Sequence, residues 1–376
     1  MTHRPWLYTM LGLAMSALAS CGEETTQPNS AADHEVTAPE LAVVHNSWIT
    51  RRDLWGTERT GFATATVPNA AGQSIVYVIG GRGASLGGIT SVMAYNVATN
   101  AWTARAPLPI PLYGMSGAAV LNGKIYIAGG YYGAPAGRTP NGFTGLLMYD
   151  PAKNSWSGKS RMPGFAPGDD PYSDYWIYGA GGGVSGVIGN KLYVLTDCWE
   201  QFQQDTYGCD PESSFNGYNL LFRYNPLTDR WIRLPSPPPD AVYTYGRGTV
   251  GMGGVIGGKL YVVGEGGGSG RLAVYDPVTN QWTAKRGLGQ MRYGAASVVY
   301  AGKLYLIGGT RLNADGTREV LRANIAYDPT TDRWINYAPL PTARTGLGGS
   351  RVTLNGEPRI EVIGGNQPGN NLQYIP

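Results

Sequence analysis

The sequence predicts an all-β fold, a β-propeller in which six four-stranded sheets form a closed ring, and three observations predict it. A string that runs from tyrosine to tryptophan recurs along the chain, an alternating apolar stretch precedes each copy, and the piece missing from the last copy stands near the N-terminus. A unit that cannot bury its own apolar faces has to stack on its neighbours, so recurrence at this period is typical of a propeller.

The first observation is the recurring string, in which tyrosine and tryptophan are always seven positions apart. The copies are YNVATNAW at 95–102, YDPAKNSW at 149–156, YNPLTDRW at 224–231, YDPVTNQW at 275–282 and YDPTTDRW at 327–334. Proline presets φ for the first central turn position, and short Asn, Asp and Thr side chains bond to the nearby backbone. Each string therefore predicts a hairpin with one aromatic side chain on either strand.

The second observation is an apolar strand that ends at a glycine pair or at the remnant of one. Its copies are VYVIGG at 76–81, KIYIAGG at 124–130, KLYVLTD at 191–197, KLYVVGE at 259–265, KLYLIGG at 303–309 and RIEVIGG at 359–365. Most are preceded by a strand of small residues and a tight turn, such as Asn122-Gly123 or Gly257-Gly258, which is the composition of two-residue hairpin turns. Each unit thus holds four short antiparallel strands.

The glycine pair, the tyrosine and the tryptophan at these offsets resemble kelch repeats, and they cover nearly all of residues 41–376. The tryptophans from Trp48 to Trp334 are spaced by 54, 54, 75, 51 and 52 positions. This agrees with the period of about 50 residues of kelch blades. The resemblance implies a propeller domain.

The third observation gives the number of blades. The sixth copy starts at Leu347 and passes Gly364-Gly365 and Tyr374, but it ends before any tryptophan, whereas Asn46-Ser47-Trp48 repeats Asn154-Ser155-Trp156. An open ring would leave two sheet edges unpaired. We therefore expect six blades, the last closed by a strand from the N-terminus.

Residues 1–20 are typical of a lipoprotein signal peptide. A weakly basic start precedes the apolar stretch Leu11–Ala19, which is too short for a permanent membrane helix. Leu18-Ala19-Ser20-Cys21 resembles the bacterial lipobox, so Cys21 is the predicted lipidation site. The alternative is an ordinary signal peptide with an incidental cysteine.

Residues 21–40 have too few apolar side chains to fold and predict a flexible tether. Gly22 is unlike the aspartate that retains lipoproteins at the inner membrane. We therefore expect an exported protein anchored to a bacterial membrane, at the periplasmic face of the outer membrane or at the cell surface. In that oxidising setting Cys198 and Cys209 are expected to form a disulfide, the alternative being two free thiols.

Charge and histidine content argue against several classes of function. The formal net charge is +3 and no run of Lys and Arg occurs, so nucleic acid is not an expected partner. The three histidines are His3, His34 and His45, which disfavours a Ser-His-Asp triad and histidine-ligated zinc, copper or iron. The glycine-rich segment 264–270 leads from strand to strand, which argues against a phosphate loop. No resident metal is predicted.

Long loops concentrate on one predicted blade. In a propeller, the loop after the second strand and the segment that joins two blades emerge on the same face. The joining segment 157–182, which contains Asp169 and Asp170, and the insertion 198–219 should therefore meet over the third blade. Such loops commonly bind ligands, although they can also cover an apolar rim.

Two carboxylates stand where other copies have the second glycine, namely Asp197 and Glu265. As neighbours, they could form an acid/base pair, which makes them the candidate catalytic residues, or they could bind Ca²⁺. The alternative is that each caps backbone N–H groups in an altered turn.

Arginines and tyrosines recur in the segments that join the blades. We expect them to ring the mouth of the central channel and to bind an anionic ligand, because a guanidinium group matches two acceptor oxygens. Bridging of neighbouring blades is the structural alternative for the arginines. The candidates are Arg59, Arg247, Arg292, Arg344, Tyr113, Tyr178 and Tyr293, with Asp169 and Asp170 as further ligand contacts.

Three functions fit this sequence. The first, which we favour, is a non-catalytic module that binds a small acidic sugar, a glycan or a protein on the loop-rich face. The second is a carbohydrate-active enzyme similar to the bacterial kelch N-acetylneuraminate epimerases, in which Asp197, Glu265, Asp169 and Asp170 would supply acid and base. The third is a structural or adhesion component of the cell surface.

Overall fold

The computed structural model describes residues 45–54, 59–83, 87–132, 141–163, 181–198, 218–238, 251–264, 270–313, 315–366 and 371–376, excluding the side chains of residues 141, 197, 198 and 218. Every regular element in these ranges is a β-strand. No helix of a length and apolarity that could span a membrane occurs among them. The predicted leader and tether, residues 1–40, lie outside the described residues.

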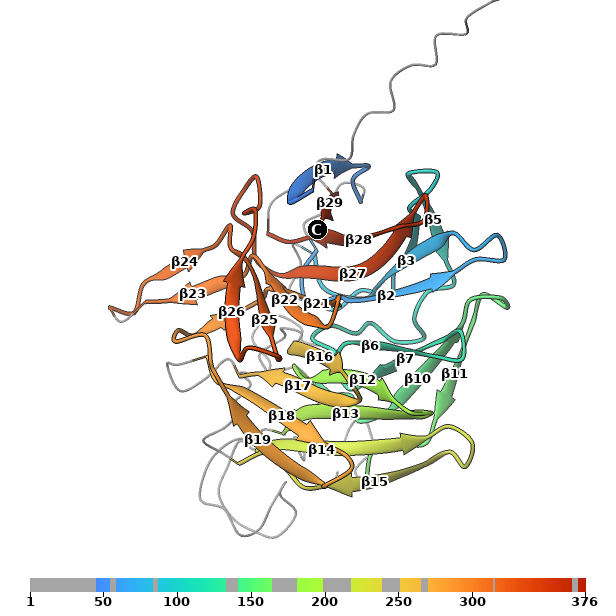
Figure 1. The fold of residues 1–376 in the computed structure, drawn as a ribbon. Coiled ribbons are helices and arrows are strands. Elements are labelled where there is room, and N and C mark those ends of the chain that lie inside the picture. The colour runs from blue at the N-terminus through green and yellow to red at the C-terminus, as the bar shows by residue number, and fades with distance from the viewer. Residues whose placement is uncertain are drawn as a thin grey trace, which may run out of the picture. The chain divides into compact units, whose positions relative to one another are not determined.

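Of the 29 strands in the described residues, 24 form six antiparallel sheets of four strands each, shown in Figure 1, and the other five form two small additional sheets. From inner to outer strand, the first sheet contains β2 (Ala63–Pro68), β3 (Ser74–Ile79), β4 (Val92–Asn96) and β5 (Ala101–Arg105). The second sheet contains β6 (Ala118–Leu121), β7 (Lys124–Ala128), β10 (Leu146–Asp150) and β11 (Ser155–Lys159). The third sheet contains β12 (Val184–Ile188), β13 (Lys191–Cys198), β14 (Tyr218–Asn225) and β15 (Arg230–Leu234).

The fourth sheet contains β16 (Met252–Ile256), β17 (Lys259–Val263), β18 (Leu272–Asp276) and β19 (Gln281–Lys285). The fifth sheet contains β21 (Ala296–Tyr300), β22 (Lys303–Ile307), β25 (Asn324–Asp328) and β26 (Arg333–Asn336). The sixth sheet contains β27 (Leu347–Leu354), β28 (Glu357–Gly364), β29 (Asn371–Ile375) and β1 (Ser47–Arg51). The inner strands contact one another in the cycle β2, β6, β12, β16, β21, β27 and back to β2. The six sheets therefore form a closed ring, as the sequence predicts.

The N-terminal strand closes the sixth sheet. β1 pairs antiparallel with β29, and Trp48 lies opposite Tyr374, as Trp102 lies opposite Tyr95 within the first sheet. The two rings of the closing pair are 5.0 Å apart, against 4.9 Å for Tyr95 and Trp102. The predicted closure is confirmed, because residues from the two ends of the chain reproduce a pairing that elsewhere lies within one hairpin.

The apolar core is divided among the joints between the sheets. Six clusters of buried residues occur, and each draws its members mainly from two neighbouring sheets. At the joint between the sixth and first sheets, for example, Val352 and Ile363 pack with Val76 and Val78. Each sheet therefore depends on both neighbours for its burial.

A repeated clamp fastens each outer hairpin to the segment that precedes it. In the second sheet, the indole of Trp156 donates to the carbonyl oxygen of Ala106 (2.9 Å), and Asn154 Oδ1 accepts from the backbone N–H of Ala106 (2.9 Å) and from the hydroxyl of Tyr149 (2.5 Å). Asn154 adopts a positive φ of 49°, which Asn tolerates better than most residues. The six tryptophans hold the carbonyls of Arg52, Ala106, Ser160, Pro235, Arg286 and Ala338.

Candidate functional site

The ends of the second strands and the segments that join the sheets meet on one face of the ring. The backbone N–H of Gly81, which ends the glycine pair of the first sheet, donates to Leu112 O in the segment leading to the second sheet (2.8 Å). Gly309 and Gly365 make the same contact with Arg344 O (2.7 Å) and Arg59 O (3.2 Å). We call this side of the ring the loop face.

The glycine pair is required by the closeness of this contact. Gly81 has a φ of 92°, and a Cβ atom at its position would lie 2.8 Å from Thr60 O. A side chain would therefore combine a strained backbone with a clash against main-chain atoms. The glycine pair that recurs along the sequence therefore marks a joint between sheets, not a ligand site.

The third sheet lacks the glycine pair because its second strand continues. β13 extends through Thr196 and Asp197 to Cys198, and these residues pair with Leu220, Asn219 and Tyr218 of β14. Asp197 therefore lies in a strand, which contradicts the alternative that it caps an altered turn. Its side chain, Glu265 and Cys209 lie outside the described residues, so the acid/base pair, a Ca²⁺ site there and the disulfide stay predictions.

Arg59 and Arg292 are almost fully buried on the loop face, with 5% and 1% of their surface exposed. Neither side chain has a hydrogen-bond partner in the part of the chain that the structure describes, and Nε and Nη1 of both are buried. Burial lowers the pKa of each to about 10, aided for Arg292 by repulsion from Arg311. Both guanidinium groups still carry a full charge at neutral pH.

Arg344 is also buried but is better compensated. Its Nε donates to Thr342 Oγ1 at 3.1 Å. Burial lowers the pKa of Arg344, and the nearby Asp53 carboxylate opposes that change. Of the predicted arginines, Arg59 and Arg292 are therefore the two whose charge lacks a partner, and Arg247 lies outside the described residues.

The segments that carry these arginines lie next to one another around the ring. Each arginine is followed two residues later by a glycine, and Gly346 donates its N–H to Gly294 O at 2.7 Å. A Cβ on Gly346 would in turn lie 2.6 Å from the side chain of Thr60. The segments of Arg292, Arg344 and Arg59 are thus consecutive neighbours, and a ring of arginines that binds a ligand stays a prediction.

The predicted tyrosines differ in exposure. Tyr113 is buried against Tyr131, with ring centroids 5.8 Å apart, and the guanidinium of Arg82 lies 5.0 Å from the Tyr113 ring centre. Tyr293 is half-buried and pairs with Thr310. Tyr178, Asp169 and Asp170 lie outside the described residues. A role of any of these five in ligand binding stays a prediction.

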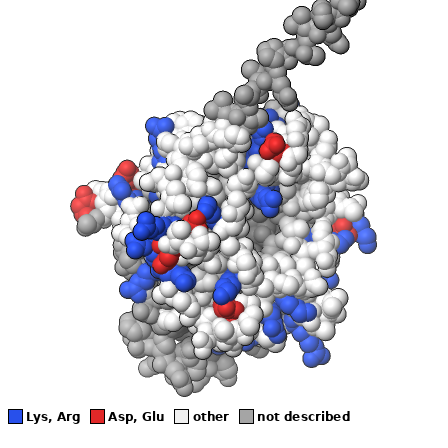
Figure 2. Space-filling model, viewed as in Figure 1, with Lys and Arg blue, Asp and Glu red and all other residues white. Residues whose placement is uncertain are grey.

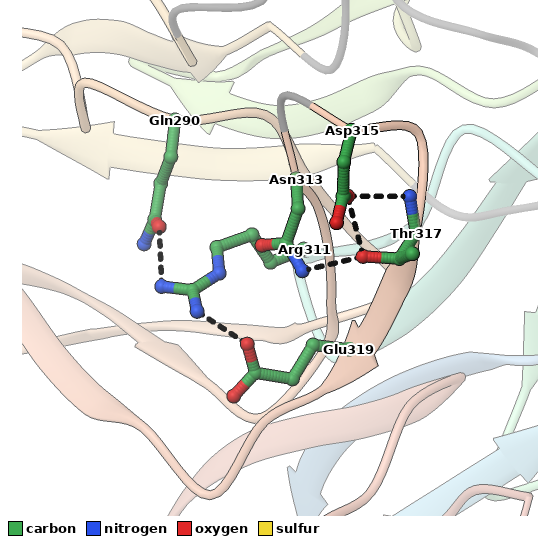
Figure 3. A network of polar contacts seen from close by, with 6 residues as sticks. All are labelled: Gln290, Arg311, Asn313, Asp315, Thr317 and Glu319. Atoms are coloured by element: carbon green, nitrogen blue, oxygen red, sulfur yellow. Dashed lines mark hydrogen bonds and ion pairs between the residues drawn. The ribbon is translucent and has the colours of Figure 1, made fainter.

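A hairpin on the fifth sheet was not predicted from the sequence. β23 (Thr310–Leu312) and β24 (Arg318–Val320) pair with each other, and β23 also pairs with β20 (Arg292–Tyr293), so that Arg311 lies directly opposite Arg292. Figure 3 shows Arg311 bonded to Gln290 Oε1 (3.1 Å) and ion-paired with Glu319. The hairpin therefore brings a second guanidinium group to Arg292.

The turn of this hairpin is held by its own polar side chains. Asp315 Oδ1 accepts from the backbone N–H (2.9 Å) and the hydroxyl (2.6 Å) of Thr317, and Asn313 Nδ2 donates to the same hydroxyl (3.0 Å), as drawn in Figure 3. The sequence signal is Asn-Ala-Asp-Gly at 313–316, which is turn chemistry. It does not recur in other repeats, so the comparison of repeats did not single it out.

Surface charge on the visible side is scattered. Figure 2 shows Lys and Arg in separate clusters among Asp, Glu and a largely uncharged surface. Among the described residues, no group of three or more His, Cys, Asp or Glu side chains is placed to hold a metal ion. The side shown in Figure 2 therefore presents no single continuous basic surface.

Comparison with known proteins agrees with this architecture. A family model described as the kelch motif matches residues 113–163 and 291–341. The chain is a kelch-repeat β-propeller. Kelch-like protein 36 of Rattus norvegicus is 30% identical over 158 residues, which is 39% of this chain and 25% of that protein. Kelch-like protein 23 of Homo sapiens is 27% identical over 301 residues, which is 79% of this chain and 45% of that protein.

A solved structure titled "Structure of YjhT" superposes on this propeller with a TM-score of 0.59 and 18% sequence identity. The match covers 84% of this chain and 93% of that structure, and at this identity it shows the fold alone. The chain spans only about a quarter to a half of the length of the curated relatives named above. The activities and partners of those proteins therefore bear on this one only as proposals.

Proposed function

We propose that this propeller is a non-catalytic binding module whose loop face recognises a carboxylate-bearing ligand, such as an acidic sugar, through Arg59 and Arg292. The observation that carries the proposal is the burial of two charged guanidinium groups without hydrogen-bond partners. Charged side chains are rarely buried unless paired, because the loss of hydration has to be offset by a partner. A carboxylate supplies the acceptor oxygens that both groups lack.

The repeat itself supports a ligand over a structural role for these side chains. The residue equivalent to Arg59 in the next joining segment is Leu112, which is fully buried in an apolar cluster. Both residues bond to the preceding glycine pair through the main-chain oxygen. The joint between sheets therefore needs no arginine side chain, which argues against the alternative that these arginines bridge the blades.

The proposal predicts that replacing either arginine makes the protein more stable but weakens ligand binding. Arg59→Leu and Arg292→Leu remove an unpaired buried charge, which should raise the free energy of unfolding by about 1 to 3 kcal/mol. N-acetylneuraminate is the probe, and its binding to the full chain is measured by isothermal titration calorimetry. Each variant should lose at least tenfold in affinity while its melting temperature rises.

Arg318→Leu is the matched control, because Arg318 is an exposed arginine on the fifth-sheet hairpin. It should leave both affinity and stability unchanged. Wild-type affinity in both buried-arginine variants would overturn the proposal. The same samples, followed by NMR for exchange of the sugar anomers, test the epimerase alternative: acceleration that Asp197→Asn removes would assign the protein to that class.

Export and lipid attachment at Cys21 form a second part of the proposal, supported by the lipobox-like segment 18–21. Expression of the full chain in a bacterium fed labelled palmitate should give a labelled membrane-bound product. Cys21→Ser should remove the label and release the protein from the membrane fraction. Equal labelling of the variant would show that Cys21 is not the attachment site.

A further inference from the structure

One of the six joints between sheets is built from different side chains. In five sheets, a tyrosine of the second strand packs on the tyrosine of the next sheet's third strand. The pairs, with the distances between ring centroids, are Tyr77 and Tyr149 (5.6 Å), Tyr126 and Tyr224 (6.2 Å), Tyr193 and Tyr275 (6.2 Å), Tyr261 and Tyr327 (6.1 Å), and Tyr305 and Tyr374 (6.4 Å). At the joint between the sixth and first sheets, Glu361 of β28 takes the place of the tyrosine, and its counterpart is Tyr95 of β4.

Glu361 is completely buried at this joint. Its Oε2 accepts a hydrogen bond from Gln373 Nε2 at 2.8 Å, but its Oε1 is buried without a partner. A carboxylate that is fully removed from water and only half hydrogen-bonded is costly to ionise. The joint therefore contains a titratable group whose protonated form suits its surroundings better than its ionised form does.

The charged and titratable groups around Glu361 are Arg51, Arg359 and Tyr95. Arg51 of β1 donates to Tyr95 Oη (3.0 Å) and Val97 O (2.5 Å), and Arg359 Nη1 donates to Gln373 Oε1 (3.1 Å). None of these described contacts is an ion pair with Glu361. The two guanidinium groups therefore favour the carboxylate only from a distance.

Burial outweighs the contacts that favour the ionised carboxylate. Burial raises the pKa of Glu361 to about 7, and the hydrogen bond from Gln373, the charge of Arg51, the side-chain amide of Asn371 and the charge of Arg359 keep it from rising further. A glutamate in an unfolded chain ionises well below this value. The folded protein consequently binds one more proton than the unfolded chain between about pH 4.5 and pH 7.

We propose that the joint between the sixth and first sheets is a proton-controlled latch, which holds the ring closed when the Glu361 carboxyl is neutral and loosens when it is ionised. The closing strand β1 lies in the same sheet and carries Arg51, so loosening of this joint acts directly on β1. The ring would then be tightest in mildly acidic surroundings.

The test follows unfolding and local opening of the full chain from pH 5 to pH 8. In wild type, the unfolding equilibrium constant should rise on the order of a hundredfold across this range through Glu361 alone. Amide hydrogen exchange, corrected for its intrinsic pH dependence, should accelerate in β1 and β29 more than in the other strands. Glu361→Gln should remove both effects.

Glu357→Gln is the matched control, because it removes the same charge from an exposed position on the same strand. It should follow wild type at every pH. Glu361→Tyr, which installs the residue of the other five joints, provides a second test if Glu361→Gln folds poorly. The proposal is overturned if a folded Glu361 variant keeps the wild-type pH dependence, or if exchange accelerates equally in all six sheets.

Discussion

The outer rim and the loop face of this propeller are built on opposite rules. At the rim, all six sheets repeat one clamp, in which a tryptophan holds a main-chain carbonyl and an Asn or Asp holds the hydroxyl of the facing tyrosine. On the loop face, the equivalent position is Leu112 in one joining segment and an arginine in three others, and of these arginines Arg59 and Arg292 are buried with unbonded Nε and Nη1 atoms. The contacts that repeat in every sheet are those that hold the ring together. The side chains that differ from sheet to sheet are the candidates for function.

The largest expected effect comes from breaking the rim where the two ends of the chain meet. Deletion of residues 46–51 removes Trp48, the closing strand and the clamp on Ala338. It leaves β29 as an unpaired edge and exposes the apolar surface of Tyr374. We expect loss of cooperative unfolding, measured by circular dichroism and calorimetry.

Deletion of six residues from the predicted tether, 30–35, is the control for that experiment. It shortens the chain equally but removes no strand of the ring. It should leave the melting transition unchanged. If the protein without residues 46–51 melted like wild type, closure by β1 would not be what stabilises the ring.

A smaller effect separates the two hydrogen bonds that the clamp asparagine can accept, one from the tyrosine hydroxyl and one from a backbone N–H of the joining segment. Asn154 accepts from both Tyr149 and the N–H of Ala106, whereas Asn280 accepts from Tyr275 but faces Pro235, which has no N–H to donate. Asn154→Ala should cost about 2 to 3 kcal/mol and Asn280→Ala about 1 kcal/mol less.

Both asparagines have similar positive φ values, 49° and 58°, so the backbone strain introduced by alanine nearly cancels in this comparison. Urea denaturation of the two variants gives the difference. If both variants lost the same free energy of unfolding, the hydrogen bond from the Ala106 N–H to Asn154 would contribute nothing to stability.

The sequence predicted the rim almost completely because its chemistry repeats. The tyrosine and tryptophan strings, the type of turn and the borrowed strand at Trp48 could all be found by comparing the repeats. The two-residue turn at Asn122-Gly123 has φ values of 51° and 69°, as the composition indicates. A feature present in every copy is visible without coordinates.

The loop face could be predicted only in part, because its decisive features depend on packing or lie outside the repeated strands. The arginines were visible as a recurring type, but the lack of partners for Arg59 and Arg292 depends on packing that no pattern encodes. Arg311 was missed, since the hairpin that carries it lies outside the four-strand pattern by which the repeats were compared. Glu361 was visible as a change in a repeated strand, but its meaning required the tyrosine pairs of the other joints.

The rim clamp leaves the sequence and the length of the joining segments free to vary. Because its tryptophan bonds only to a main-chain carbonyl, the six residues that it holds are of four different types, including proline: Arg52, Ala106, Ser160, Pro235, Arg286 and Ala338. The chain beyond a held residue can therefore lengthen without disturbing the wheel, as it does after Ser160, where the next inner strand begins only at Val184. These positions are natural graft points at which foreign loops could be inserted on a stable frame.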